Sequence, residues 1–267
     1  MTTELKQYMQ KNLRAVQLKE LSILCTVTDI CKSNGIEYWL DGGTLLGAKR
    51  HGGFIPWDDD IDIAIRKEDT KRFTEAMKRE LPENLFLQIP ETDPSYNLPI
   101  IKIRDRNSLI VEFGDNFKLP YKKGLYVDVF PMLPHPTMSR KALHTITRGY
   151  CRSNAILNAL HRYSWRSVAE LFWFGTKRIL FSTLWYLSNI FLSKNKFMGN
   201  TIEDNGYGIT HLNETVFPLT TISFEGETFK APANPDAYLT DIYGDYMQLP
   251  PEDKRTIHAS FYIDKLV

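Results

Sequence analysis

Apolar positions in the first part of the chain recur at helical spacing. Between residues 4 and 33 they return every three or four positions, with lysines and glutamates between them, which predicts one long amphipathic helix. The pair Asn34-Gly35 ends this helix with residues that favour a turn. A short apolar strand is predicted over residues 36–40, and residues 41–44 then open a turn into a short helix.

The middle of the chain changes to alternating or short continuous apolar runs, which are typical of strands. One helical stretch, residues 67–80, interrupts these runs and ends before a Leu-Pro pair. The predicted strands cover residues 60–65, 85–89, 98–104, 109–113 and 124–130.

The second half of the chain predicts helices first and a hairpin afterwards. Residues 139–197 are helical in pattern, without strand signals. Two short strands, 216–224 and 227–230, are joined by a two-residue turn and form a hairpin. Asn234-Pro235 combines an N-cap with proline at the first helical position, which predicts a helix over 235–243.

Together these elements predict an α+β (mixed α/β) fold, with a small mixed sheet flanked by helices. We expect a core region over residues 1–136, a helical insertion over 137–204, and a C-terminal extension over 205–267 that packs on the core and completes it. The order of elements favours one embellished domain over two independent ones.

Composition changes this picture little. The 267 residues are 43% apolar and 12% aromatic, enough for a sizeable core. The formal net charge of +1 predicts no nucleic-acid partner. Three cysteines without metal-ligand spacing, and a polar N-terminus without the apolar centre of a signal peptide, indicate a cytoplasmic protein with reduced thiols.

The densest chemistry lies in the acidic run from Asp58 to Asp62. Asp58, Asp60 and Asp62 share one parity of the predicted strand, and isoleucines occupy the other. The apolar flanks bury such a strand, so its carboxylates need a positive partner. Asp60 and Asp62 can converge on one or two Mg²⁺ ions, with Mn²⁺ as the alternative metal. The competing interpretation is an exposed acidic strand end.

A third acid comes from the β-branched and aromatic run 126–130, which carries Asp128 in its middle. A carboxylate in so apolar a strand needs a hydrogen-bond partner or a metal. Asp128 would ligate the metal, accept the proton of an attacking hydroxyl, or do both. The competing interpretation is an aspartate hydrogen-bonded inside the core.

Gly42-Gly43-Thr44 directly follows a predicted strand. Glycines let a backbone approach a phosphate closely, and a following helix N-terminus adds favourable partial charge. Such a triplet alone is more often a tight turn. With an Asp-x-Asp pair and a third acid downstream, however, the layout resembles that of the nucleotidyltransferase superfamily.

Four basic side chains are candidates for neutralising a diphosphate and a leaving phosphate. Arg50 and His51 follow the glycine turn, and Lys102 and Arg104 share one face of the predicted strand 98–104. The competing interpretation for the latter pair is a solvated sheet face.

The run from Gly43 to Ile63 resembles the LicD family of phosphorylcholine transferases, which is related to the fukutin-type enzymes and has the nucleotidyltransferase fold. The resemblance extends to residues 102–105, 124–131 and 243–255. It assigns metal binding to Asp60, Asp62 and Asp128, and nucleotide contact to the Gly42-Gly43 turn.

This resemblance implies Mg²⁺-dependent transfer of phosphocholine from CDP-choline to a sugar hydroxyl of a cell-surface glycan, with release of CMP. The acceptor would be a lipid-linked precursor of teichoic acid or lipopolysaccharide. Two alternatives remain open: a nucleotidyltransferase that moves an NMP group and releases pyrophosphate, and a non-catalytic binding member of the family. Choline favours an aromatic cage, for which the candidate walls, unless they belong to the core, are Trp39, Trp57, Tyr121 and Tyr126.

The stretch 165–197 is broadly apolar and holds three of the five tryptophans. The polar residues 175–178 interrupt it, and the charge-free part that follows is too short for a membrane-spanning helix. Two interpretations remain open. The stretch either rests on the inner leaflet of the membrane as an interfacial helix, which would place the protein at the cytoplasmic face, or it packs in the core or a dimer interface.

Overall fold

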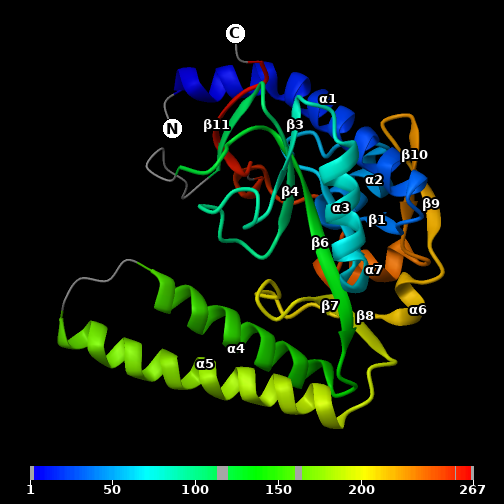
Figure 1. The fold of residues 1–267 in the computed structure, drawn as a ribbon. Coiled ribbons are helices and arrows are strands. Elements are labelled where there is room, and N and C mark those ends of the chain that lie inside the picture. The colour runs from blue at the N-terminus through cyan, green and yellow to red at the C-terminus, as the bar shows by residue number, and fades with distance from the viewer. Residues whose placement is uncertain (1–2, 113–119, 160–163, 256, 266–267) are drawn as a thin grey trace. The chain divides into compact units, whose positions relative to one another are not determined.

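A computed structural model describes residues 3–112, 120–159, 164–255 and 257–265 (Figure 1). The chain forms two compact units, one from residues 1–131 with 217–267 and one from residues 132–216. The predicted helical insertion, 137–204, falls within the second unit. The mixed α+β class is confirmed, and the predicted domain limits themselves stay a prediction.

The long N-terminal helix is confirmed as α1 (Thr3–Ser33). Its apolar face buries Val16, Leu24 and Val27 completely. This face packs on β4 and β11 of the same unit. Gly35 adopts a φ of +62° just past the helix, where glycine avoids the steric cost of a Cβ.

The sheet of the first unit has the strand order β1-β2-β6-β4-β3. Its strands are β1 (Tyr38–Leu40), β2 (Asp62–Arg66), β6 (Tyr126–His135), β4 (Ile101–Asp105) and β3 (Leu85–Gln88). The antiparallel register places Gln88 opposite Lys102, and Lys102 opposite Asp128. Because opposite residues point to the same face of a sheet, one face carries a polar row across β3, β4 and β6.

Short helices and two strand pairs complete this unit. The helical elements are α2 (Gly42–His51), the 3-10 turn η1 (Lys67–Asp69), α3 (Thr70–Glu80), α7 (Pro235–Tyr243) and the 3-10 turn η2 (Glu252–Lys254). The strand pairs are β5 (Leu109–Glu112) with β11 (Ala259–Ile263), and β9 (Thr220–Phe224) with β10 (Glu227–Ala231).

The predicted hairpin and the last helix are confirmed in their turn chemistry. The turn between β9 and β10 has positive φ at both Glu225 and Gly226, as tight hairpin turns require. The Asn234 side chain accepts a hydrogen bond from the Ala237 N–H at 3.1 Å and caps α7. Gly244 follows the helix with a φ of +68°.

The second unit contains α4 (Arg140–Asn158), α5 (Trp165–Phe191), β7 (Phe197–Asn200), β8 (His211–Leu212) and α6 (Asn213–Val216). Within the predicted helical stretch 139–197, residues 140–158 and 165–191 are helical. Residues 160–163, between these two helices, lie outside the described residues. The prediction of no strand around 197 is wrong. The sequence predicts a strand that ends at residue 130, whereas β6 continues to His135 and there pairs with β7.

The helix α5 packs against α4, where Gly149 leaves room for the Phe181 ring. None of the residues of α5 is buried, and its exposed side chains include large apolar ones. The interpretation of this stretch as a core helix is therefore wrong.

Candidate active site

The start of α2 and the start of β2 are joined by a compact set of hydrogen bonds. Asp41 caps α2, because its Oδ1 accepts a hydrogen bond from the Gly42 N–H at 2.8 Å. The Thr44 hydroxyl oxygen accepts from the Asp62 N–H at 2.8 Å, and the Asp41 N–H donates to the Asp62 carbonyl at 3.1 Å. Tyr238 of α7 also donates to Asp41, at 2.8 Å. The helix N-terminus and the acidic strand end are thus fixed side by side.

The two glycines of this turn are needed to make room for carboxylates. Gly42 has a φ of +49°, and a Cβ built on it would lie 2.7 Å from Asp62 Oδ2. A Cβ on Gly43 would lie 2.8 Å from Asp58 Oδ2. The carboxylates of Asp58 and Asp62 therefore lie directly against the N-terminus of α2, where the helix dipole favours negative charge.

Asp60 lies just before β2, which begins at Asp62 and not at residue 60 as predicted. The segment before the strand is held instead by side chains from elsewhere, among them Gln17, which donates to the Asp58 carbonyl at 2.9 Å. Asp128 approaches from β6, since its N–H donates to the Ile61 carbonyl at 2.8 Å.

Burial raises the pKa values of these four carboxylates, and neighbouring aspartates add to the rise for three of them. Burial and the charges of Asp60 and Asp128 raise the pKa of Asp62 well above its usual value. Burial and the Asp60 charge do the same for the pKa of Asp58. Burial raises the pKa of Asp60 to about 6, with Asp59 and Asp128 acting in the same direction. Burial also raises the pKa of Asp128, although Lys102 opposes the rise.

Asp59 has a different role. Its side chain is fully buried, and its carboxylate accepts the N–H groups of His258 and Ala259 at 2.7 and 2.8 Å. It therefore ties the segment before β2 to β11, and it stays close to its neighbours, because ligand atoms of Asp58, Asp59 and His258 all lie within 4.8 Å of one another.

His258 is a residue of this site that the sequence analysis missed. Its Nδ1 lies 3.1 Å from Asp60 Oδ2 and 4.0 Å from Asp58 Oδ1. The Asp59 hydrogen bond and the charges of Asp60 and Asp58 raise the pKa of His258 to about 9, so the ring is a cation at neutral pH. No local pattern marks it, because it lies far along the chain and reaches the site only through the pairing of β11.

Lys102 and Arg104 are both 2% exposed, so the solvated-face interpretation is wrong for them. Lys102 Nζ lies 2.8 Å from Asp128 Oδ1 and donates to Oδ2 at 3.0 Å. Arg104 donates to Gln88 at 2.5 Å and to the Gly124 carbonyl at 2.7 Å. Lys102 is thus the partner that the sequence required for Asp128, and Arg104 stabilises the sheet.

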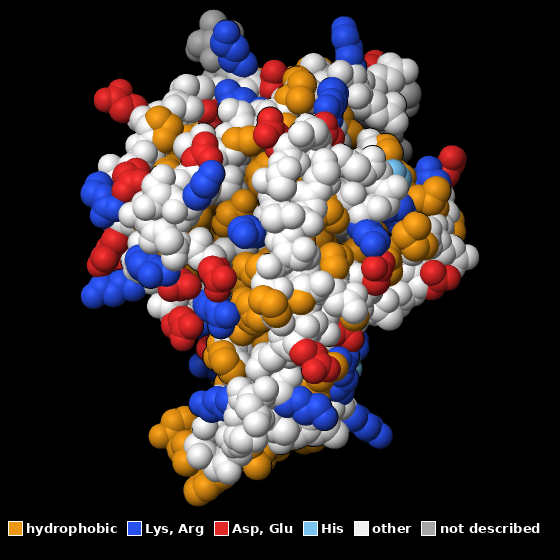
Figure 2. Space-filling view, turned by 90° about the vertical axis from the view of Figure 1, so that its right-hand side faces the viewer, with side chains coloured by type: hydrophobic (Ala, Val, Ile, Leu, Met, Phe, Trp, Pro, Cys, Tyr) orange, Lys and Arg blue, Asp and Glu red, His pale blue; other side chains and the backbone are white. Residues whose placement is uncertain are grey.

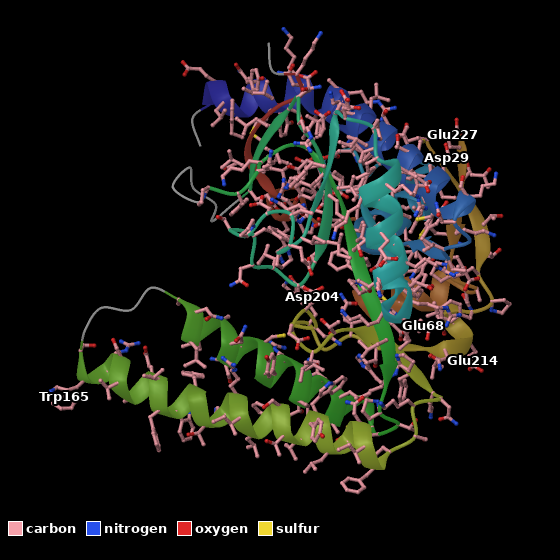
Figure 3. The ribbon with its side chains drawn as sticks, viewed as in Figure 1. Asp29, Glu68, Trp165, Asp204, Glu214 and Glu227 are labelled. Atoms are coloured by element: carbon pink, nitrogen blue, oxygen red, sulfur yellow. The ribbon has the colours of Figure 1, made fainter. Side chains whose placement is uncertain are left out.

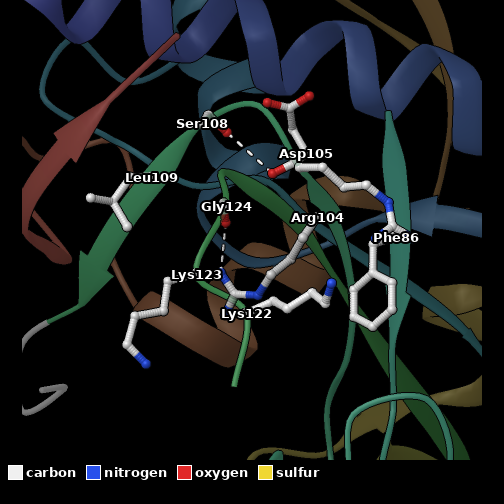
Figure 4. A pocket seen from close by; sticks show the side chains of 9 residues that line it. Phe86, Arg104, Asp105, Ser108, Leu109, Lys122, Lys123 and Gly124 are labelled. Carbon is white, nitrogen blue, oxygen red and sulfur yellow. Dashed lines mark hydrogen bonds between the residues drawn. The ribbon is translucent and has the colours of Figure 1, made fainter. Parts of the chain in front are cut away.

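Arg104 faces a hollow of about 300 Å³ that none of the carboxylates of Asp58 to Asp62 or Asp128 lines (Figure 4). The hollow is bounded by Phe86, Arg104, Asp105, Arg106, Ser108, Leu109, Lys122, Lys123 and Gly124. Figure 4 shows the lysine side chains pointing in different directions, not toward a common point. Arg104 lines this hollow, and its charge also lowers the pKa of Asp128 on the neighbouring strand.

Arg50 and His51 stand at the end of α2, away from the glycine turn. Arg50 donates to the Tyr246 carbonyl at 2.8 Å and to His51 Nε2 at 3.0 Å. Burial lowers the pKa of Arg50, and the charges of Tyr243 and Asp58 oppose the fall, so Arg50 lies within electrostatic range of the acidic site. Burial and the charges of Asp62 and Asp41 raise the pKa of the Tyr243 hydroxyl at the end of α7. Tyr243 is thus also within electrostatic range of the acidic site.

Two of the aromatic residues considered for a choline cage belong to the core, which is the alternative that the sequence left open for them. Trp39 is fully buried, and its indole donates to the Tyr238 hydroxyl at 3.3 Å. Tyr126 is 1% exposed, with Lys102 over its ring. Both belong to the core. Trp57 is half-buried under the Arg255 guanidinium.

A comparison with protein families identifies this arrangement. Residues 35–168 match the family model described as LicD/FKTN/FKRP, nucleotidyltransferase domain. The chain belongs to the LicD/FKTN/FKRP family. The matched span includes the glycine turn, the acidic run, Lys102 and Asp128, and as a member of this family the protein is a phosphotransferase.

Two characterised relatives of this LicD-family chain differ in how much of it they cover. The lipopolysaccharide cholinephosphotransferase LicD of Haemophilus influenzae is 26% identical over 257 residues, which is 92% of this chain and 95% of the relative. The ribitol 5-phosphate transferase FKRP of Homo sapiens is 31% identical over 113 residues, 40% of this chain and 19% of the relative. The similarity to LicD thus includes the second unit and the C-terminal extension, residues 205–267.

The acidic run of this LicD-family chain offers a matched pair of substitutions. Asp62→Asn removes a charge that its neighbours repel, so without metal it should raise the free energy of unfolding. Asp59→Asn replaces an oxygen that accepts a backbone N–H by a donor, and should lower it by about 1–3 kcal/mol. Thermal unfolding in a chelator measures both. A lower melting temperature for Asp62→Asn would show that this carboxylate stabilises the fold.

Gly42→Ala and Gly52→Ala form a second matched pair, because both glycines have positive φ, +49° and +71°. Both substitutions should cost about 1 kcal/mol of stability. Only at Gly42 does the new Cβ meet Asp62, whereas it meets nothing within 4 Å at Gly52. Calorimetric Mn²⁺ titration should therefore show weaker binding for Gly42→Ala alone. Equal affinities in the two variants would separate the glycine turn from the metal site.

Proposed function

We propose that this chain transfers phosphocholine from CDP-choline to a sugar hydroxyl of a cell-surface glycan, with release of CMP. The observation that carries the proposal is the group of buried carboxylates at the N-terminus of α2. The similarity to a lipopolysaccharide cholinephosphotransferase along 92% of the chain supports the choline head group. The acceptor would be a lipid-linked precursor of lipopolysaccharide or teichoic acid.

The carboxylate oxygens of this site suit a divalent cation as ligands. Asp60, Asp62 and Asp128 offer oxygen atoms, which Mg²⁺ and Mn²⁺ prefer. Burial raises the pKa values of all three, so their charged forms would gain from a bound cation. These three residues would hold one or two ions, which when bound supply charge neutralisation for the diphosphate.

The residues of the chain then position the reactants. The N-terminus of α2 presents backbone N–H groups and partial positive charge toward the phosphates. Lys102 holds the Asp128 carboxylate in one orientation by contacts to both of its oxygens. The acceptor hydroxyl attacks the phosphorus that bears choline, in line with the departing CMP, and the acidic group takes up its proton.

The assay for this proposal follows the products. Full-length protein with CDP-choline, Mg²⁺ and a choline-free glycan precursor should release CMP and label the glycan. Asp62→Asn should lose at least a thousandfold in rate, because it removes a charge from the metal site. The exposed Glu75→Gln on α3 is the control and should keep full activity.

Other products would identify the alternatives. Pyrophosphate in place of CMP would indicate transfer of an NMP group. CMP release only from CDP-ethanolamine or a CDP-linked ribitol phosphate would change the head group, as the relation to a ribitol 5-phosphate transferase allows. Release of neither product from any donor would contradict the catalytic proposal and favour a binding role.

For the location of the protein, we propose peripheral contact of α5 with the cytoplasmic leaflet. Trp165, Phe172, Ile179 and Tyr186 recur every seven residues and are 90%, 76%, 68% and 65% exposed. A seven-residue spacing keeps them on one line along the helix. Figure 3 shows side chains of α5 pointing away from α4, with Trp165 at the start of the helix.

The charges of α4 and α5 also support contact with a membrane surface. The helices α4 and α5 carry seven lysines and arginines but one acid, Glu170. Figure 2 shows hydrophobic and basic side chains together on the part of the molecule formed by these helices. Apolar side chains beside basic ones suit a surface of anionic lipid. Within the part of the chain that the structure describes, we find no helix with the length and apolar content to cross a bilayer.

Sedimentation with vesicles tests this contact. Wild-type protein should bind phosphatidylglycerol vesicles more tightly than phosphatidylcholine ones. Phe172→Ser should weaken that binding about 30-fold, because roughly 2 kcal/mol of apolar burial is lost. Leu98→Ser, which removes an exposed leucine elsewhere, should change nothing. A dimer in solution that Phe172→Ser dissociates, without vesicle binding, would show that the surface joins two copies of the chain.

A further inference from the structure

Glu20 of α1 is a buried acid that the proposed reaction leaves unused. Its side chain is fully buried, and both of its carboxyl oxygens lack a hydrogen-bond partner among the described residues. Its polar neighbours on the helix are paired: Gln17 donates to the Asp58 carbonyl, and Lys19 lies 3.2 Å from Asp105. Glu20 is therefore the exception on this part of α1.

Glu20 follows Gln17 by three residues and therefore shares its face of α1. This face contacts the acidic segment, because Gln17 donates to the Asp58 carbonyl at 2.9 Å. Burial, followed by the charges of Asp60, Asp59, Asp58 and Asp128, raises the pKa of Glu20 well above its usual value. It therefore adds to the acidic site from the side of α1, whereas the other acids come from the segment before β2 and from β6. Gln17, one turn earlier on the same helix, fixes α1 against that segment.

An unpaired buried carboxyl is costly to a fold. Even as a neutral acid it loses the hydrogen bonds that water would make, at about 1–3 kcal/mol, and as an anion it would cost several kcal/mol more. A leucine or a glutamine at this position would fill a similar volume without a charge. The position of Glu20 is explained if a cation at the acidic site uses its oxygens.

We propose that Glu20 is a further carboxylate of the divalent-cation centre, where it either ligates the ion or accepts a hydrogen bond from a water that the ion holds. The proposal rests on the proposed metal dependence. A bound ion would give the Glu20 carboxylate the partner that it otherwise lacks. The centre would then take donors from α1 as well as from the sheet, which couples the N-terminal helix to metal binding.

Calorimetric titration of the full chain with Mn²⁺ tests this role. Glu20→Gln keeps the shape of the side chain and removes its charge, and it should weaken Mn²⁺ binding by about 10–100-fold. The exposed Glu4→Gln on the same helix is the control and should bind as the wild type does. The melting temperature of Glu20→Gln in chelator should equal or exceed that of the wild type, while the rise that Mn²⁺ produces should be smaller.

Glu20→Asp provides the second variant. It keeps the acid but withdraws the oxygens by one methylene group, so Mn²⁺ binding should again weaken if the reach of the side chain matters. Unchanged Mn²⁺ affinity in both variants, with an unchanged stabilisation by Mn²⁺, would overturn the proposal and leave Glu20 as a structural acid. The same titration on Asp62→Asn separates the two levels. If wild-type protein binds no Mn²⁺, the proposed metal dependence fails, and if only Asp62→Asn loses binding, the role of Glu20 alone fails.

Discussion

Mutual repulsion among buried carboxylates is the constraint on which the rest of this site depends. Burial raises the pKa values of Asp58, Asp60, Asp62 and Asp128, and neighbouring carboxylates add to the rise for the first three. The chain nevertheless holds them together with a capped helix, a strand end and two glycines. Such an arrangement lowers the stability of the fold, and a bound cation would restore that stability. The glycine turn is therefore explained by the acids as much as by a nucleotide.

Some charged groups of the site are paired within the fold, and others remain available to a ligand. Asp59 is committed to two backbone N–H groups of the C-terminal return, and Lys102 is committed to Asp128. His258 contributes a cation that partly balances Asp60. What remains is an excess of oxygen donors beside a helix N-terminus. This arrangement suits a metal and a phosphate together.

Much of this could be predicted from the sequence, and the parts that could not share a physical reason. The long helix, the hairpin turn and the cap of α7 follow from local patterns. His258 and Glu20 could not be found, because each reaches the site by tertiary packing from an element distant in the chain. Lys102 was assigned to phosphate for the same reason: its partner Asp128 becomes its neighbour only through the register of β4 and β6. The strand β7 was missed because only its pairing with β6 makes four residues a strand.

Anomalous diffraction from a crystal soaked with Mn²⁺ and CDP-choline tests the central claim most directly. The account predicts at least one Mn²⁺ peak among the oxygens of Asp60, Asp62 and Asp128, with the donor diphosphate on the same ion beside the N-terminus of α2. A well-occupied donor without Mn²⁺ at these carboxylates, or Mn²⁺ bound at another group of residues, would contradict it.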